Sequence, residues 1–156
     1  MVDTVLDRIR QLLRLREVDF REVHHAPTYT SEESARVRGE SIGTGGKAIV
    51  MKMENEFKLF VLSASKRVDS QRIKEHVGIK KIRFATKEEL YVLTDLVPGS
   101  IPPFGRPILP FDLCVDNSVT ANEKIAFNAG SLTDSIIMNS RDYLKVTAPC
   151  VFEFSI

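Results

Sequence analysis

The sequence lacks the features that mark several large classes of protein. It has no tryptophan, only two cysteines and three histidines in 156 residues. No uninterrupted apolar run approaches the ~20 residues of a membrane-spanning helix, and the N-terminal segment alternates charged with apolar residues, so we expect neither a membrane span nor a signal peptide. No pair of cysteines or histidines has the spacing of a metal site, so we expect no metal and no cofactor. We therefore expect a cytoplasmic protein whose cysteines are reduced.

The sequence also has no large excess of positive or negative charge. Lys and Arg number 22 and Asp and Glu number 21, which leaves a net charge of +1. This balance argues against a protein held on DNA, or on any nucleic acid, by a broad basic surface, but it allows a local pocket that grips one or two phosphates. The length predicts one domain over residues 1–156. Cys114 and Cys150 lie in apolar stretches, and we expect both to be buried small side chains.

Capping signals predict where the helices begin. Asp3 is the expected N-cap of an amphipathic helix that runs to about residue 15. Thr30 with Glu33 predicts a capping box at the start of a second helix, and Thr86 with Glu89 predicts another.

Strand-like runs fill most of the remaining sequence. Residues 47–53 and 57–64 are separated by ENE and predict an antiparallel hairpin. In all we expect about seven strands and four or five helices, without strict βαβ alternation. This pattern predicts the α+β or mixed α/β class, with a mixed sheet and helices packed around it.

The stretch GTGGKAIVMK, residues 43–52, is the first of three segments that could carry chemistry. Lys47 stands at the start of a predicted strand, on the same face as three hydrophobic residues. It is either a strand-end charge that extends into water or a ligand for an anion. Gly46 and the glycine before it let backbone N–H groups approach a ligand closely. The segment is not a Walker loop, because Ala48 follows the lysine.

The second segment is VPGSIPPFG, residues 97–105. Its three prolines and two glycines predict a stiff loop, in which Gly99 and Ser100 could present backbone N–H groups to an oxygen. Such a loop suits an oxyanion or carbonyl pocket. An ordinary tight connection between a helix and a strand is the alternative.

The third segment is FNAGSLTDSI, residues 127–136. Gly130 and Ser131 lie between two predicted strands, so a hairpin turn with Asn128 and Asp134 at its ends is one interpretation. A pocket-lining turn is the other. The sequence shows no nucleophile elbow and no Ser–His–Asp or Cys–His arrangement. Any catalysis would therefore depend on positioning and dipoles.

Four motifs in order, T-x-x-E, GGKAIVMK, GSIPPFG and FNAGS followed by an aspartate, resemble the YbaK family and the related editing domain of bacterial prolyl-tRNA synthetases. The resemblance covers about residues 20–150. It implies a strongly curved mixed sheet surrounded by helices. It also implies hydrolysis of the ester of tRNAs that carry a wrong small amino acid (alanine, cysteine, serine or threonine) on tRNA for proline or another tRNA. The substrate's own ribose 2′-hydroxyl and water would supply the proton transfer.

The resemblance also implies roles for single residues. Lys47 falls on the family's essential lysine, and Gly99 on a glycine whose backbone helps hold the substrate carbonyl. Gly130 and Ser131 fall on a turn that lines the same pocket. Asp134 matches an aspartate of many relatives.

Further residues are expected around this pocket. Tyr29 and Thr30 fall at its rim, and Gly46 and Ser100 flank the lysine and the glycine as substrate-binding positions. A free lysine has a pKa of ~10.4, so we expect Lys47 to grip the terminal phosphate or the ester oxygen rather than act as a base. The following are either helpers at the rim or solvated surface charges: Arg36, Arg38, Lys66 and Arg67.

The expected partner is the acceptor end of aminoacyl-tRNA, with an aminoacyl-tRNA synthetase as a second candidate and neither membrane nor DNA. Cysteine-clearing members commonly carry a hydroxyl residue where this chain has Ala48, which favours alanine or another small residue over cysteine. Two rival functions stay open. One is a non-catalytic module of the same fold that binds tRNA or a synthetase, and the other is a nucleotide-phosphate binder that uses GTGGK.

Overall fold

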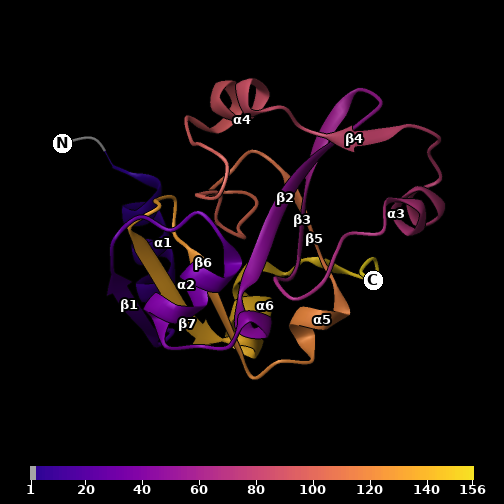
Figure 1. Ribbon diagram of the computed structural model, residues 1–156. Helices are drawn as coiled ribbons and strands as arrows, with labels where there is room; N and C mark the ends of the chain where they lie inside the picture. The colour runs from indigo at the N-terminus through magenta and orange to yellow at the C-terminus, as the bar shows by residue number, and fades with distance from the viewer. Residues whose placement is uncertain (1–2) are drawn as a thin grey trace.

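Two sheets, with helices packed around them, make up the computed structural model, which describes residues 3–156 (Figure 1). The strands are β1 (Phe20–His24), β2 (Gly46–Met53), β3 (Glu56–Ser63), β4 (Ile82–Phe84), β5 (Asp112–Val115), β6 (Lys124–Asn128), β7 (Asp134–Asn139) and β8 (Cys150–Val151). The helices are α1 (Val5–Leu15), α2 (Ser31–Arg38), α3 (Ser70–Val77), α4 (Lys87–Thr94), α5 (Asn117–Thr120) and α6 (Ser140–Thr147), with a 3-10 turn, η1 (Ile42–Thr44).

The larger sheet is mixed and has the strand order β4-β2-β3-β5-β8. Strands β2, β3 and β4 pair antiparallel, whereas β5 pairs parallel with both β3 and β8. The smaller sheet, β1-β7-β6, is antiparallel. A bridge between Gly45 and Ala126 joins the two sheets. The predicted class is confirmed, although residues 3–156 form eight strands in two sheets rather than about seven in one.

The predicted helix starts agree with the structure to different degrees. Thr86 and Glu89 form the reciprocal capping box that was expected. Thr30 caps α2, because its hydroxyl oxygen accepts a hydrogen bond from the Glu33 N–H. The Glu33 carboxylate accepts from the Thr30 hydroxyl and not from the Thr30 backbone N–H, so the predicted box is not reciprocal.

The prediction that Asp3 caps the first helix is wrong, because Thr4 is the N-cap. Thr4 has Asp7 three residues later and forms a reciprocal box with it, at 3.0 and 3.3 Å. The residue three after Asp3 is Leu6, which offers no polar group for such a pair.

Side-chain alternation along β2 and β3 divides the interior into two clusters. Val50, Leu59 and Val61 face the first cluster, with α1, β6 and the loop that follows α4. Phe60 and Leu62 face the second cluster, with α3 and the C-terminal segment. The pocket described below lies at the beginning of β2, where the two sheets meet.

The C-terminal region departs from the sequence-based expectation. Cys114 is buried as predicted, but the prediction for Cys150 is wrong, because it lies exposed on the two-residue edge strand β8. The predicted strand over residues 150–156 is confined to β8 and to an isolated bridge from Ser155 to Val68. No helix in residues 3–156 is long and apolar enough to cross a membrane.

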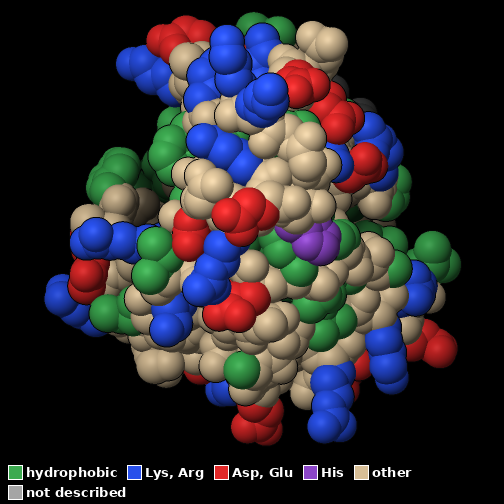
Figure 2. All heavy atoms as spheres, turned by 90° about the vertical axis from the view of Figure 1, so that its right-hand side faces the viewer, with side chains coloured by type: hydrophobic (Ala, Val, Ile, Leu, Met, Phe, Trp, Pro, Cys, Tyr) green, Lys and Arg blue, Asp and Glu red, His purple; other side chains and the backbone are tan. Residues whose placement is uncertain are grey.

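One outer face carries an uneven charge. A groove there lies near the far end of β2 and has five cationic residues and one acidic residue, Glu54. Figure 2 shows Lys and Arg side chains gathered at the top of this view. We call it the basic groove, and its cations are Lys52, Lys74, Lys80, Lys81 and Arg83.

Candidate active-site pocket

A pocket of about 360 Å³ opens where β2 begins. Residues of α2 and of the turn before it form one wall, and the start of β2 forms another. The loop after α4 and the β6–β7 turn complete the lining through Pro98, Gly99, Ile101, Asn128 and Leu132. Five of the nine predicted site residues line this pocket: Tyr29, Thr30, Gly46, Lys47 and Gly99.

Lys47 lies at the seam between the glycine-rich segment and the sheet. Its backbone pairs with Leu62 on β3, and its Nζ donates a hydrogen bond to the Lys66 carbonyl at 2.6 Å. Burial, and then the positive charge of Arg67, lower the pKa of Lys47. Within residues 3–156 its amine forms no ion pair with a carboxylate, so its remaining N–H donors are available to a ligand.

The loop after α4 is held in place by one side chain from β6. Gly99 has a φ of 88°, a conformation that favours glycine. Asn128 donates from Nδ2 to the Gly99 carbonyl at 2.8 Å. Gly99 thus lies on the pocket wall, and the peptide that joins it to Ser100 has a fixed orientation.

Ser100 belongs to the loop but not to the pocket lining. Its backbone N–H donates to the Val97 carbonyl at 3.1 Å, and its hydroxyl donates to the same oxygen at 2.7 Å. Both polar groups are therefore used to close the turn. The N–H that the sequence suggested for a ligand is occupied within the loop.

The remaining three predicted residues, Gly130, Ser131 and Asp134, lie outside the pocket lining. The hairpin interpretation is confirmed, since β6 ends at Asn128 and β7 begins at Asp134. Gly130 has a φ of 77°, and a Cβ built on it would lie 2.8 Å from a methyl carbon of Val5 on α1.

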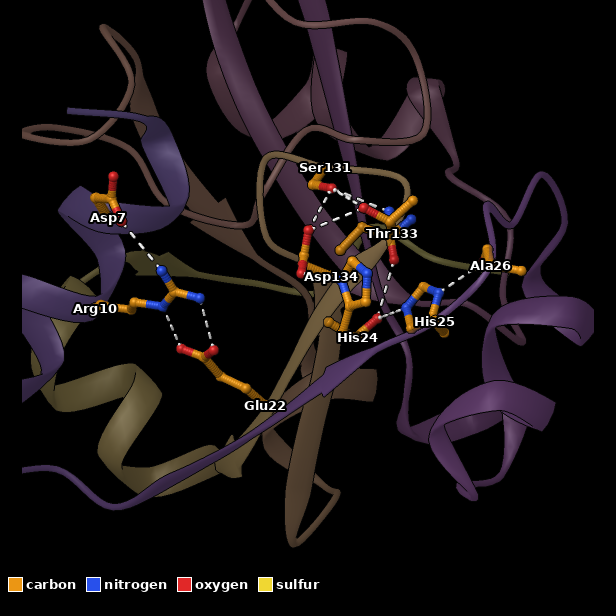
Figure 3. Close-up of polar contacts among 11 residues, drawn as sticks. Asp7, Arg10, Glu22, His24, His25, Ala26, Ser131, Thr133 and Asp134 are labelled. Atoms are coloured by element: carbon orange, nitrogen blue, oxygen red, sulfur yellow. Dashed lines mark hydrogen bonds and ion pairs between the residues drawn. The ribbon is translucent and has the colours of Figure 1, made fainter. Parts of the chain in front are cut away.

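Asp134 takes part in a polar network of its own (Figure 3). Its carboxylate accepts from Ser131 and Thr133, and it pairs with Nδ1 of His24 at 2.8 Å. Burial alone would raise the pKa of Asp134, but these hydrogen bonds, chiefly from His24, outweigh burial and lower it. The network ties the turn to β1.

Arg38 is the main pocket residue whose position the sequence left open. It ends α2 and is only 8% exposed. Its Nε donates to the Ser135 hydroxyl at 2.9 Å, and its Nη2 donates to Oδ1 of Asn128 at 3.0 Å. Burial lowers the pKa of Arg38 to about 10, and no carboxylate of residues 3–156 pairs with it. Ser34, Ala35 and Arg38 share one buried helix face, and this 3.6-residue spacing was the signal available.

Asn128 connects these features into one unit. It accepts from Arg38 and from the Ser135 hydroxyl, and it donates to the Gly99 loop. Residues that are distant in the sequence thus fix one another around the pocket. No cluster of three or more His, Cys, Asp or Glu side chains suited to a metal ion occurs among residues 3–156.

Comparison with known proteins identifies the family. The model of the aminoacyl-tRNA editing domain matches residues 25–146. The chain belongs to this family. The resemblance inferred from the four motifs is therefore confirmed.

Two relatives and one solved structure illustrate the similarity. The multifunctional Ser/Thr-tRNA deacylase ProXp-y of Escherichia coli K12 is 34% identical over 153 residues, which cover 94% of this chain and 90% of the relative. A proline–tRNA ligase of Macrococcus caseolyticus is 23% identical, over 86% of this chain and 22% of the ligase. A solved structure described as a candidate trans-editing enzyme for prolyl-tRNA synthetase aligns with a TM-score of 0.84 at 24% identity, over 100% of this chain and 99% of that one. That structure supports the editing-domain fold.

Proposed function

We propose that residues 1–156 form a single cytoplasmic trans-editing domain that hydrolyses the ester of tRNA charged with a wrong small amino acid. The observation that carries the proposal is the pocket that brings Lys47 and Gly99 together, in a chain 34% identical to a Ser/Thr-tRNA deacylase over nearly its whole length. That relative's name supports serine and threonine as the amino acids. Alanine, which Ala48 favoured, is the competing choice.

In this proposal the protein binds and orients the ester while water attacks it. The water oxygen bonds to the carbonyl carbon, the bond from that carbon to the ribose oxygen breaks, and the ribose oxygen receives a proton. The neighbouring 2′-hydroxyl of the substrate relays the proton. Donors placed at the carbonyl stabilise the charge that develops in the transition state.

Lys47 and Gly99 are the donors available for this task. The Lys47 amine already donates to a carbonyl, so we propose a role in binding the ester oxygen or the terminal phosphate and not as a general base. The Gly99 N–H makes no hydrogen bond with a residue of 3–156, and the Asn128 contact to the Gly99 carbonyl holds the loop directly after it. Tyr29 and Thr30, at the exposed rim, would contact the terminal adenosine.

The basic groove supports a polynucleotide partner. It lies near the end of β2 opposite Lys47, and eight residues of strand span roughly 25 Å. Phosphates of the acceptor stem could contact its four lysines while the 3′ end reaches the pocket, whereas Arg83 is paired with Glu89. A prolyl-tRNA synthetase is the second partner we propose, and tRNA for proline the preferred carrier. The proline–tRNA ligase relative supports this choice, because it contains a segment similar to most of this chain.

Hydrolysis of a panel of charged tRNAs tests the proposal. Alanyl, cysteinyl, seryl and threonyl esters, each on tRNA for proline and on its own tRNA, are incubated with wild type, Lys47→Ala and the matched control Lys145→Ala. Lys145 is exposed on α6, away from the pocket lining. We expect wild type and the control to hydrolyse the seryl or threonyl ester. Lys47→Ala should lower the rate of this hydrolysis about 100-fold or more.

A folded wild type that hydrolyses no member of the panel would contradict the proposal. That result would favour a non-catalytic tRNA-binding module of the same fold.

A further inference from the structure

Arg38 places a cation in the floor of the pocket without an acidic partner. Two of its three side-chain nitrogens donate to Ser135 and Asn128. The third, Nη1, makes no hydrogen bond with any residue of 3–156. A Cβ built on Gly45 would lie 3.6 Å from Nη1, so this atom lies against the glycine-rich segment that lines the pocket.

A buried charge normally has an ionic or polar partner for each of its donors. Leaving a donor of a desolvated guanidinium unpaired costs free energy. Arg38 lines the pocket, so its unused donor is positioned to meet a ligand there. An oxygen of the bound substrate is the partner that would satisfy it.

The depth of Arg38 in the pocket limits which oxygen of the substrate can accept this hydrogen bond. The aminoacyl group is the end of the tRNA and enters the pocket first, whereas the terminal phosphate lies beyond the ribose. Lys47 is only half-buried and Gly99 is exposed, so the scissile ester fits nearer the mouth, between them. Arg38 is more deeply buried, and the small side chains of Ala35 and Ala48 also line the pocket. The guanidinium would repel the substrate's α-ammonium group. The part of the substrate that reaches Arg38 is therefore the amino-acid side chain.

We propose that Arg38 is a specificity-determining residue, whose Nη1 donates a hydrogen bond to the side-chain hydroxyl of a seryl or threonyl ester. This inference rests on the proposed function and adds the reason for the choice of amino acid. A substrate with a methyl group or a hydrogen in place of the hydroxyl covers this pocket-facing donor without giving it a partner, so the site selects serine over alanine and over apolar isosteres. Ser135 and Asn128 hold the guanidinium in the orientation that this requires.

Wild-type protein with isosteric substrates gives the first test. Seryl and 2-aminobutyryl esters on the same tRNA differ by a hydroxyl against a methyl group, and so do threonyl and valyl esters. We expect kcat/KM to favour the hydroxyl member of each pair by about 10- to 100-fold, the range of a hydrogen bond to a charged group. Equal values of kcat/KM within both pairs would overturn the inference. If wild type cleaves none of the four esters, the proposed function itself fails.

Substitutions then assign the preference to Arg38. Arg38→Met keeps the length of the side chain without its donors, and we expect the preference for serine over 2-aminobutyrate to fall to about one while 2-aminobutyryl ester is still cleaved. Arg38→Lys, which retains the charge, offers one donor group in place of the planar fork and should lose most of the preference.

Lys145→Ala is the matched control, because this cation is exposed on α6 and does not line the pocket. We expect it to leave kcat/KM for both esters, and the preference for serine, unchanged. An unchanged serine preference in folded Arg38→Met or Arg38→Lys protein, verified by thermal unfolding, would overturn the assignment.

Discussion

The pocket and the second hydrophobic cluster both use residues of β2, but their interiors differ. The cluster contains Phe60, Leu62 and Phe154, which fill the space with apolar side chains. The pocket region buries polar groups instead, among them Arg38 and Ser135, and leaves a cavity beside Arg38. Burying polar groups costs free energy unless each finds a partner. A region that keeps them beside an open space is organised for a ligand, whereas the other region only stabilises the fold.

The largest expected effect comes from the apolar side of this comparison. Phe60 is fully buried, and its ring lies 5.4 Å from the ring of Phe154 in an edge-to-face arrangement. Phe60→Ala should lower the free energy of unfolding by about 3–5 kcal/mol, because it removes apolar contacts and leaves a cavity. Urea unfolding measures this loss.

Deacylation per folded molecule should change little in Phe60→Ala, since the residue does not line the pocket. A large loss of turnover with unchanged stability would contradict the division between the two regions.

Two glycines with positive φ sharpen the comparison. In Gly130→Ala the new Cβ would overlap Val5, and the backbone would be strained as well, so we expect a loss of about 1–3 kcal/mol in unfolding free energy. In Gly99→Ala the Cβ would lie 3.4 Å from Leu132 on the pocket lining, so the stability loss should be smaller.

Activity should rank the two glycine variants in the opposite order. Gly99→Ala should lower kcat/KM about tenfold or more, because it shifts a donor at the ester. Gly130→Ala should retain wild-type kcat/KM below its unfolding temperature. Thermal unfolding and seryl-tRNA hydrolysis, measured on both variants, test this, and the reverse ranking would show that the turn at Gly130 belongs to the site.

Local signals predicted the parts of the molecule that depend on neighbours in the sequence. The β2–β3 hairpin, the Thr86 capping box and the position of Lys47 at the start of a strand all follow from short-range patterns. The four motifs also led to the correct family. Asp3 failed as a cap because the competing reciprocal pair begins one residue later, at Thr4.

The composition of the pocket depends on long-range contacts and could not be predicted in the same way. Arg38 becomes a floor residue only because β6 and β7 bring Asn128 and Ser135, 90 and 97 positions away, to its guanidinium. The β6–β7 turn was expected at the pocket, and it lines the pocket through Leu132. Gly130 and Asp134 of the same turn pack instead against α1 and β1, through Val5 and His24.

A non-cleavable substrate analogue tests the central claim most directly. In 3′-deoxy-3′-(L-serylamino)adenosine an amide replaces the ester, and its binding can be followed through the backbone amide signals of the labelled protein by NMR. If the pocket is the substrate site, the largest shifts will occur at Gly46, Gly99 and Asn128, at one end of β2. Shifts centred on Lys80 and Lys81 in the basic groove, with the pocket signals unmoved, would contradict the account.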